Sequence, residues 1–164
     1  MALRSDWSAD NCPVARGLEV FGDPWSVLVL REVFLGNRRF DGLRATLGAA
    51  ENILSARLRR LTEAGLLRKV PYGGGARPRQ EYHLTPAGED ALPVLNAVAA
   101  WAQKHTVSPT GRAMTFWCTR CGQSSASADW CATCNAAITV ADAAWERPTA
   151  PGVRIDLAAV LDDA

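Results

Sequence analysis

The sequence lacks any apolar run long enough to cross a membrane or to serve as a secretion signal. A membrane-spanning helix needs about 20 mostly apolar residues, and the first segment, MALRSDWSADN, carries no apolar stretch. We therefore expect a cytoplasmic protein that makes no contact with a membrane.

The sequence also lacks the residue groupings that enzymes use. It has no nucleophile–base pair, no paired carboxylates and no phosphate-cradling motif. The glycines at 73–75 do not precede a helix, as a nucleotide-binding loop must. Its two histidines, His83 and His105, have no neighbours of catalytic type. The prediction is a protein that is not an enzyme and has no catalytic residues.

What the sequence does contain is a composition typical of a folded domain. It has 164 residues, 48% of them hydrophobic, and five cysteines. This length fits one medium domain, or one domain with an appendage. Five cysteines in a reducing compartment favour metal or redox chemistry over a disulfide scaffold.

Residues 38–85 organise the chain. Asp41 is a predicted N-cap of a short helix that ends at Gly48, and a second helix runs from about Ala50 to Gly65. Alternating residues then predict two strands, 67–71 and 80–84, joined by a glycine-rich basic tip. Two helices followed by a basic hairpin predict a winged helix-turn-helix, which places its second helix in the major groove of DNA.

The charge distribution agrees with a DNA-binding role. The 38–85 segment holds ten of the 18 Lys and Arg residues, whereas the whole chain has a net charge of only +1. On the second helix, Asn52, Ser55 and Arg59 point outward and are predicted to read base edges. Arginines flanking that helix and on the wing are predicted to contact the phosphate backbone. The predicted DNA-binding residues are Arg38, Arg39, Asn52, Ser55, Arg59, Arg60, Arg77 and Arg79.

Three further helices surround this segment. Residues 13–22 form a short first helix, and residues 24–36 form a core helix with Asp23 as N-cap and Gly36 as its stop. The last helix spans 86–105 and bends at Pro93. Asn96 is its only strongly polar residue between Ala91 and Ala102, so more than one of its faces needs covering. The expected cover is a second copy of the chain, giving a homodimer through the first and last helices; the alternative is the C-terminal appendage.

The same region resembles the HxlR-type branch of the MarR-like winged-helix transcriptional regulators. The resemblance spans roughly 12–103 and rests on Cys12-Pro13, Gly22-Asp23-Pro24-Trp25, Gly36, Arg39-Phe40, Leu54-Ser55, Arg57-Leu58, Leu61, Gly65-Leu66, Arg77-Pro78, Glu81-Tyr82, Leu84-Thr85, Gly88, Leu92-Pro93-Val94-Leu95 and Trp101. It implies a dimeric regulator that binds double-stranded DNA. It also makes Cys12 a candidate redox sensor, with a buried structural thiol as the alternative.

Beyond a linker at 108–114, two Cys-x2-Cys knuckles are nine residues apart. Two such knuckles complete a four-sulfur shell for one structural Zn²⁺ per chain, and Gly122 and Asn135 suit the left-handed turns that follow them. A rubredoxin-like iron site and a reversible dithiol–disulfide switch stay open as alternatives. The predicted metal ligands are Cys118, Cys121, Cys131 and Cys134.

The predicted fold class is therefore mainly α with a small β-wing (α+β). Residues 1–107 form the DNA-binding and dimerisation domain, 115–140 a zinc-ribbon-like module, and 141–164 an acidic tail. That tail either contributes an edge strand near 153–157 or stays mobile. The predicted function is a sequence-specific transcriptional regulator that responds to a redox signal or an unidentified ligand. The alternative is a protein-interaction module in which winged helix and ribbon dock onto the transcription machinery.

Overall fold

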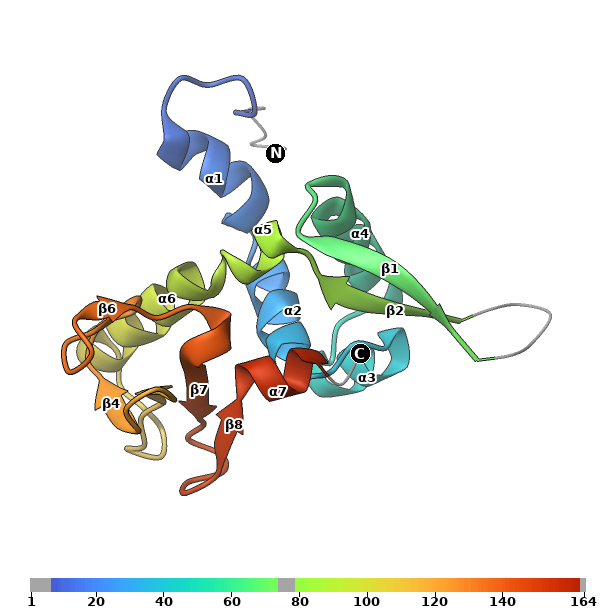
Figure 1. Cartoon of the computed structure of the whole chain (residues 1–164). Helices are drawn as coiled ribbons and strands as arrows, with labels where there is room; N and C mark the ends of the chain where they lie inside the picture. Colours follow the sequence, from blue (N-terminus) through green and yellow to red (C-terminus); the bar gives the residue numbers. More distant parts are fainter. Residues whose placement is uncertain (1–6, 74–78, 163–164) are drawn as a thin grey trace.

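The computed structural model describes residues 7–73 and 79–162, and its two halves pack closely together (Figure 1). The N-terminal half is mainly helical and carries one two-stranded wing. Its elements are α1 (Pro13–Phe21), α2 (Pro24–Phe34), α3 (Phe40–Leu47), α4 (Glu51–Glu63), β1 (Leu67–Tyr72), β2 (Arg79–Leu84), α5 (Pro86–Glu89) and α6 (Leu92–His105).

The C-terminal half is built from short strands. A four-stranded sheet has the order β4-β3-β7-β8, and a separate small hairpin pairs β5 with β6. The elements are β3 (Thr115–Cys118), β4 (Gln123–Ser125), β5 (Trp130–Cys131), β6 (Ala136–Ala137), the 3-10 turn η1 (Val140–Asp142), β7 (Ala143–Glu146), β8 (Arg154–Asp156) and α7 (Leu157–Asp162). None of the helices in the described ranges is long and apolar enough to cross a membrane.

Helix α2 is the centre of the core, as its sequence predicts. The Asp23 side chain accepts a hydrogen bond from the backbone N–H of Trp25 at 2.9 Å and caps the helix. Gly36 has a φ of +85°, a left-handed conformation that glycine adopts without strain. Leu30 and Phe34 are fully buried and join one continuous apolar cluster that extends into both halves of the chain.

The helix-turn-helix forms with one correction at its start. Asp41 is not the N-cap: the capping position is Arg39, and Asp41 lies in the first turn of α3. The reason is tertiary, because the chain stays extended until Arg39. Arg38 accepts a backbone hydrogen bond from Tyr82 at 2.9 Å, and Arg39 bridges to Glu81 in the wing. Gly48, with a φ of +64°, ends α3 as predicted.

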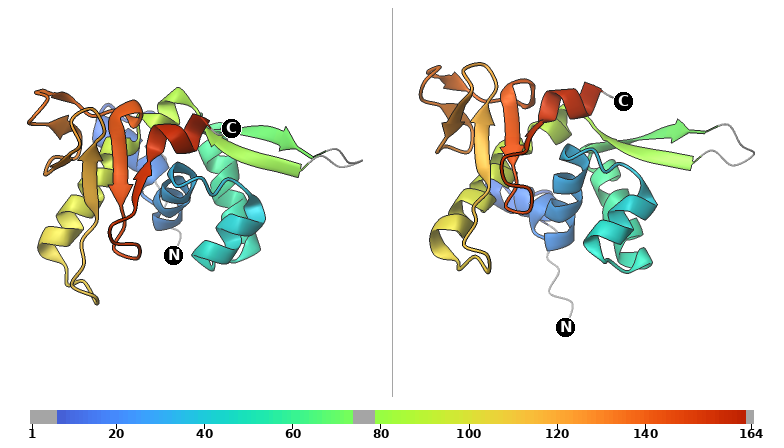
Figure 2. Two further views of the ribbon diagram at one scale, coloured as in Figure 1. Left: turned by 60° about the horizontal axis from the view of Figure 1, so that its bottom comes forward. Right: turned by 90° about the horizontal axis from the view of Figure 1, so that it is seen from below.

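The wing is an antiparallel hairpin in regular register, from Leu67 opposite Leu84 to Tyr72 opposite Arg79. It projects from the helical core (Figure 2). The pair at its base, Leu67 with Leu84, is buried, whereas toward the tip Tyr72 is half-buried and Arg79 is exposed. The residues between the strands, including the predicted DNA contact Arg77, lie outside the described part of the chain.

The predicted helix over 86–105 is in fact two helices. Thr85 caps α5 by accepting a hydrogen bond from the Gly88 N–H at 3.1 Å, and α5 ends at Glu89. Pro93 lies in the first turn of α6, where its missing N–H leaves no intrahelical bond unmade. The chain therefore breaks between α5 and α6 and starts a new helix next to Pro93. The predicted bend within one continuous helix is wrong.

Residues 141–162 of the predicted tail are folded into η1, β7, β8 and α7, so the described part of the tail is not a mobile segment. β7 is an inner strand of the sheet, paired with β3 on one side and β8 on the other. Trp145 is 1% exposed and its ring lies 5.7 Å from that of Phe34. Helix α7 packs on α2. The edge strand expected near 153–157 is confirmed as β8, from Arg154 to Asp156. The contacts of Trp145 and α7 with the helical half explain why this acidic segment is ordered.

Candidate nucleic-acid interface and metal centre

Helix α4 has one buried face and one exposed polar face. Leu54, Leu58 and Leu61 are at most 1% exposed and fix the helix against α2. The apolar spacing leaves Asn52, Ser55 and Arg59 on the outer surface, where all three are exposed. The Arg59 side chain is 73% exposed and only loosely paired with Glu63, at 3.9 Å. Donors and acceptors on this face are therefore free to meet the edges of bases.

The exposed face of α4 and the wing together form a concave surface, which we call the α4–wing groove. Its lining residues are Phe40, Asn52, Ser55, Ala56, Arg59, Lys69 and Tyr82. Three residues predicted from α4 therefore lie in one groove with a lysine from β1. The sequence reasoning counted Lys69 as a basic residue but assigned it no role. Its position two residues into an exposed wing strand is the signal that could have found it.

Arg39 connects the start of α3 to the wing. Its Nε donates a 2.8 Å hydrogen bond to Glu81, and its guanidinium lies 4.4 Å from the centre of the Tyr72 ring. The hydrogen bond from Arg39 lowers the pKa of the Glu81 carboxyl, and a further one from His83 adds to this effect. The Arg39 side chain remains 61% exposed, so it holds the wing while keeping donors at the surface.

Two predicted DNA contacts have intramolecular partners instead. Arg38 is 8% exposed, and its guanidinium donates to the backbone carbonyl of Val160 in α7. Arg60 donates to both the backbone and the carboxylate of Glu19 in α1, the latter at 2.5 Å. These arginines tie α7 and α1 to the winged helix, so a phosphate contact by either would require a rearrangement. Arg79, by contrast, is exposed at the start of β2.

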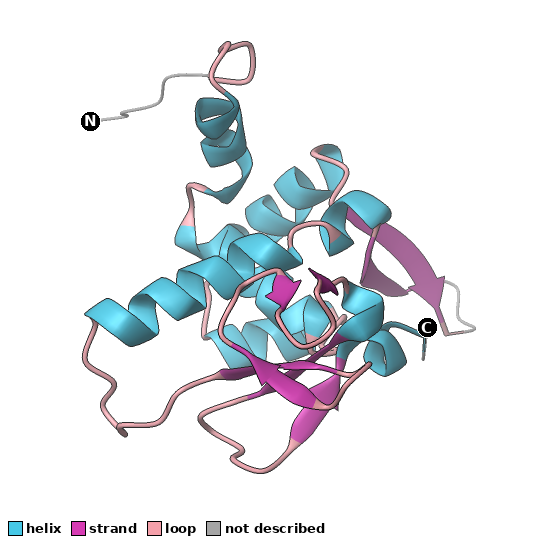
Figure 3. Cartoon of the chain, turned by 60° about the vertical axis from the view of Figure 1, so that its left-hand side comes forward, coloured by secondary structure: helices cyan, strands magenta, loops and turns pink. Residues whose placement is uncertain are grey.

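A second surface feature is apolar and involves α1 and α6. In α6, Val94, Val98 and Trp101 are 37%, 54% and 63% exposed and follow helical spacing along one side. In α1, Val14 and Leu18 are 68% and 48% exposed, and no residue of α1 is buried. Figure 3 shows α1 extending away from the rest of the chain. The C-terminal half covers the side of α6 that carries Asn96, which is 2% exposed.

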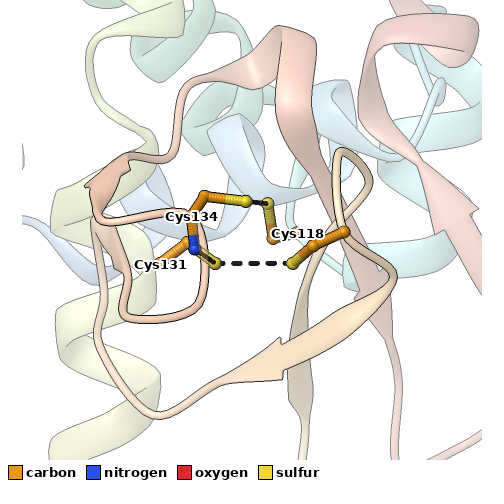
Figure 4. Close-up of side chains that lie close together, drawn as sticks. Cys118, Cys131 and Cys134 are labelled. Atoms are coloured by element: carbon orange, nitrogen blue, oxygen red, sulfur yellow. Dashed lines mark hydrogen bonds between the residues drawn. The ribbon is translucent and has the colours of Figure 1, made fainter.

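The four cysteines of the two knuckles converge in the C-terminal half. Their sulfur atoms all lie within 4.8 Å of one another. The sulfur of Cys118 is 3.9 Å from that of Cys134, and those of Cys121 and Cys131 are 3.6 Å apart (Figure 4). A tetrahedron with zinc–sulfur bonds of about 2.3 Å has sulfur–sulfur edges of about 3.8 Å. The spacing therefore fits one four-coordinate metal ion.

The backbone around the cluster also has the form that metal knuckles need. Gly122 and Asn135 have φ values of +70° and +50°, which confirms the left-handed turns predicted after each knuckle. The Cys134 N–H points at the sulfur of Cys131, 3.4 Å away. Residues 138–140 form no strand of a ribbon, because the Ile138 N–H donates to the backbone carbonyl of Asp129 at 2.7 Å and Val140 begins η1. Both side chains are buried and belong to the continuous apolar cluster of the chain.

The four thiols affect one another's pKa values because they lie so close together. Burial would raise the pKa of Cys118, but hydrogen bonds from the Cys121 backbone and from Arg120 lower that pKa to about 6. Contact with Cys121, followed by burial and the other sulfurs, raises the pKa of Cys134 to about 12. Four adjacent thiolates repel one another, and a divalent metal ion between them would offset their negative charge.

Cys12 lies apart from this cluster. It is exposed at the N-cap of α1, and its backbone N–H donates to the Asp10 carboxylate at 2.7 Å. Within a single chain, therefore, the Cys12 thiol is not buried, and its role as a sensor stays a prediction.

A winged helix with an exposed polar face on its second helix and a basic wing defines the class of helix-turn-helix DNA-binding proteins. Within that class, the chain belongs to the HxlR-like helix-turn-helix family, which matches residues 20–109. The earlier resemblance is thereby confirmed at the level of the family, and this assignment points to transcriptional regulation.

Individual relatives agree with the family. The chain is 36% identical over 145 residues to the HTH-type transcriptional regulator Rv3095 of Mycobacterium tuberculosis, covering 88% of this chain and 90% of that protein. The solved structure of PA1607, a proposed transcription factor, is 42% identical with a TM-score of 0.59, covering 64% of this chain and 72% of PA1607. The redox regulator HypR in its reduced form is 26% identical with a TM-score of 0.52, covering 57% of this chain and 92% of HypR.

Proposed function

We propose that the protein is a homodimeric, sequence-specific DNA-binding transcriptional regulator whose C-terminal half is held by one structural Zn²⁺. The observation that carries this proposal is the α4–wing groove, in which Asn52, Ser55, Arg59 and Lys69 lie together on an exposed concave surface. A recognition helix inserted in the major groove would bring the first three to base edges and leave Lys69 near a phosphate.

The proposed DNA contacts divide by role. Asn52, Ser55 and Arg59 read bases, whereas Arg39, Lys69, Arg77 and Arg79 contact phosphates. Arg38 and Arg60 act indirectly, because their ties to α7 and α1 hold the winged helix in position. Of the eight DNA-binding residues predicted from the sequence, six are thus kept as direct contacts, and Lys69 is added to them.

The homodimer is proposed from the two exposed apolar surfaces. Trp101 and Leu18 are large apolar side chains that stay in contact with water in a single chain. Removing apolar surface from water stabilises a complex by about 25 cal/mol for each Å². A symmetric partner that covers α1 and α6 removes both surfaces from water and places two α4 helices on one DNA duplex. The two-fold arrangement then predicts a palindromic operator.

A redox response through Cys12 is proposed as a property of this regulator. Its support is the exposure of the thiol at the start of a helix and the similarity to HypR, which is a redox regulator. Oxidation there would act on α1, the helix that Arg60 ties to α4.

The decisive experiment is a salt titration of DNA binding, on a footprinted site and on random DNA, for the wild type, Arg59→Ala and Arg79→Ala. Loss of a base contact in Arg59→Ala should cost about 1–3 kcal/mol on the specific site and alter sequence preference. Loss of a phosphate contact in Arg79→Ala should weaken both DNAs alike and reduce the slope of log K against log salt by about one.

Two outcomes would contradict the proposal. A wild-type preference below about tenfold for the footprinted site would favour a module that binds the transcription machinery instead of DNA. Identical behaviour of the two variants would keep DNA binding but reject the division between base and phosphate contacts.

A further inference from the structure

A cavity of about 540 Å³ lies between the winged helix and the C-terminal half. One wall comes from α2, with Val27 and Leu28, and from its C-cap Leu35. A second wall comes from α6 and includes Leu95, Ala102 and Val98, which also belongs to the exposed apolar surface of that helix. The third wall consists of Met114, Trp145, Arg147, Pro148 and Thr149, from the C-terminal half. That third wall lies outside residues 20–109, which match the HxlR-like family. The cavity is therefore a feature of this two-part architecture.

The size and lining of the cavity are those of a small-molecule site. Ligand cavities commonly enclose about 300–1,000 Å³ and are mostly apolar with a few convergent polar groups. Here most of the lining is aliphatic or aromatic, and the charged residues are Arg31, Glu32 and Arg147. A molecule with an apolar body and one charged group would match this distribution.

The sign of the charge follows from the three charged residues. Glu32 is 4% exposed, but its carboxylate is already paired with Arg31 at 2.7 Å. Arg147 makes no ion pair with any residue in the described ranges. Its Nε is buried and has no hydrogen-bond acceptor there. That nitrogen lies below the cavity surface, and no ion pair in the described ranges offsets the positive charge that Arg147 brings to the cavity wall.

We propose that this cavity binds an organic anion with an apolar body, whose carboxylate or sulfonate accepts a hydrogen bond from Arg147. The apolar body lies against Leu28, Leu95 and Trp145, and the Arg31–Glu32 pair closes the polar part of the wall. Because the occupant touches α2, α6 and the turn between β7 and β8, it ties together the helical and C-terminal halves. The inference goes beyond DNA binding and is independent of it.

The test uses two fluorescent probes of nearly equal shape, 8-anilinonaphthalene-1-sulfonate and neutral N-phenyl-1-naphthylamine, titrated into the full-length protein. The anion should bind at one site per chain and about ten- to a hundredfold more tightly than the neutral probe, as a hydrogen bond to a charged group contributes. Arg147→Gln should remove that difference and leave the affinity for the neutral probe unchanged. Arg112→Gln, at an exposed arginine outside the cavity, is the matched control and should behave as wild type.

A cavity-filling variant tests the location. Ala102→Phe should weaken both probes at least tenfold, and decanoate should displace the anionic probe from the wild type more effectively than decanamide does. Equal binding of the two probes by the wild type would overturn the anionic specificity. Unchanged binding by Ala102→Phe would place the probes elsewhere and overturn the site. Leu18→Asp, the substitution expected to break the proposed dimer, provides the last comparison. If this variant binds the probes and the wild type does not, then a second copy of the chain fills the cavity and the proposal is wrong.

Discussion

Trp145 donates its indole N–H to the side-chain oxygen of Asn96 across a buried contact of 2.9 Å. The amide nitrogen of Asn96 in turn donates to the carbonyl of Ala128 at 2.8 Å. One polar side chain in an apolar helix thus makes two bonds to different parts of the C-terminal half. Asn96 is a buried polar link between the proposed dimerisation helix and the cysteine-containing half.

The first prediction concerns this link. Asn96→Ala leaves a buried indole N–H and a backbone carbonyl without partners, so the free energy of unfolding should fall by about 2–4 kcal/mol. Chemical denaturation measures the change. Asn52→Ala is the control, because that amide is exposed on another helix, and it should change stability by less than about 0.5 kcal/mol. Equal effects of the two substitutions would contradict a structural role for Asn96.

The second prediction separates two neighbouring arginines of α4. Arg60→Gln should lower the free energy of unfolding by about 1–3 kcal/mol, since it removes the partly buried contact with Glu19. Arg59→Gln, at a side chain 73% exposed, should leave stability nearly unchanged and weaken DNA binding. Denaturation and DNA titration of both variants provide the comparison. A stable Arg60→Gln with weakened DNA binding would restore Arg60 to the phosphate contacts.

The third prediction tests the apolar surfaces. Trp101→Asp and Leu18→Asp should each shift the protein from dimer to monomer, because a charge on a surface removed from water is costly unless paired. Sedimentation at micromolar concentration reports the mass. Val107→Asp is the control: Val107 is 95% exposed but lies beyond α6. A wild-type monomer with an intact fold would rule out the dimer.

The fourth prediction concerns the metal. Elemental analysis should find about one zinc per chain in the wild type and in Cys12→Ser, and a large loss in Cys121→Ser. Loss of zinc should increase hydrogen exchange in residues 115–146 while α4 and the wing stay protected, because their apolar contacts are with α2. Iron with thiolate charge-transfer absorption, or no metal in freshly purified protein, would reject zinc.

The fifth prediction is a pH dependence. Burial lowers the pKa of His83 from its ordinary 6.5, assisted by the charges of Arg38 and Arg68, and opposed by Glu81. The unfolded state therefore binds the proton first, and stability should fall as the pH drops below about 6.5. The Glu81 carboxyl, whose pKa is lowered chiefly by Arg39, adds a further loss as the pH falls below its ordinary 4.5. Unfolding free energies of wild type and His83→Gln from pH 7 to 5 should differ in slope; parallel curves would contradict the prediction.

Features that depend on neighbouring residues could be predicted from the sequence. The Asp23 cap, the left-handed glycine Gly48 and the buried leucines of α4 follow from local backbone preferences and helical spacing, and all form as expected. The spacing of the two knuckles likewise brings four sulfurs together, because each pair is only one turn long and a small hairpin positions the second pair.

Side-chain contacts between residues far apart in the sequence could not be predicted and are seen only in the folded chain. Arg38 contacts a carbonyl 122 residues away and Arg60 a residue 41 positions away, so an arginine that looks free in the sequence is held inside the fold. Trp145 and the acidic segment around it become ordered only because Phe34 and Asn96 lie opposite. Local propensity sets which elements form, but burial and charge pairing between distant elements set which surfaces remain free to bind.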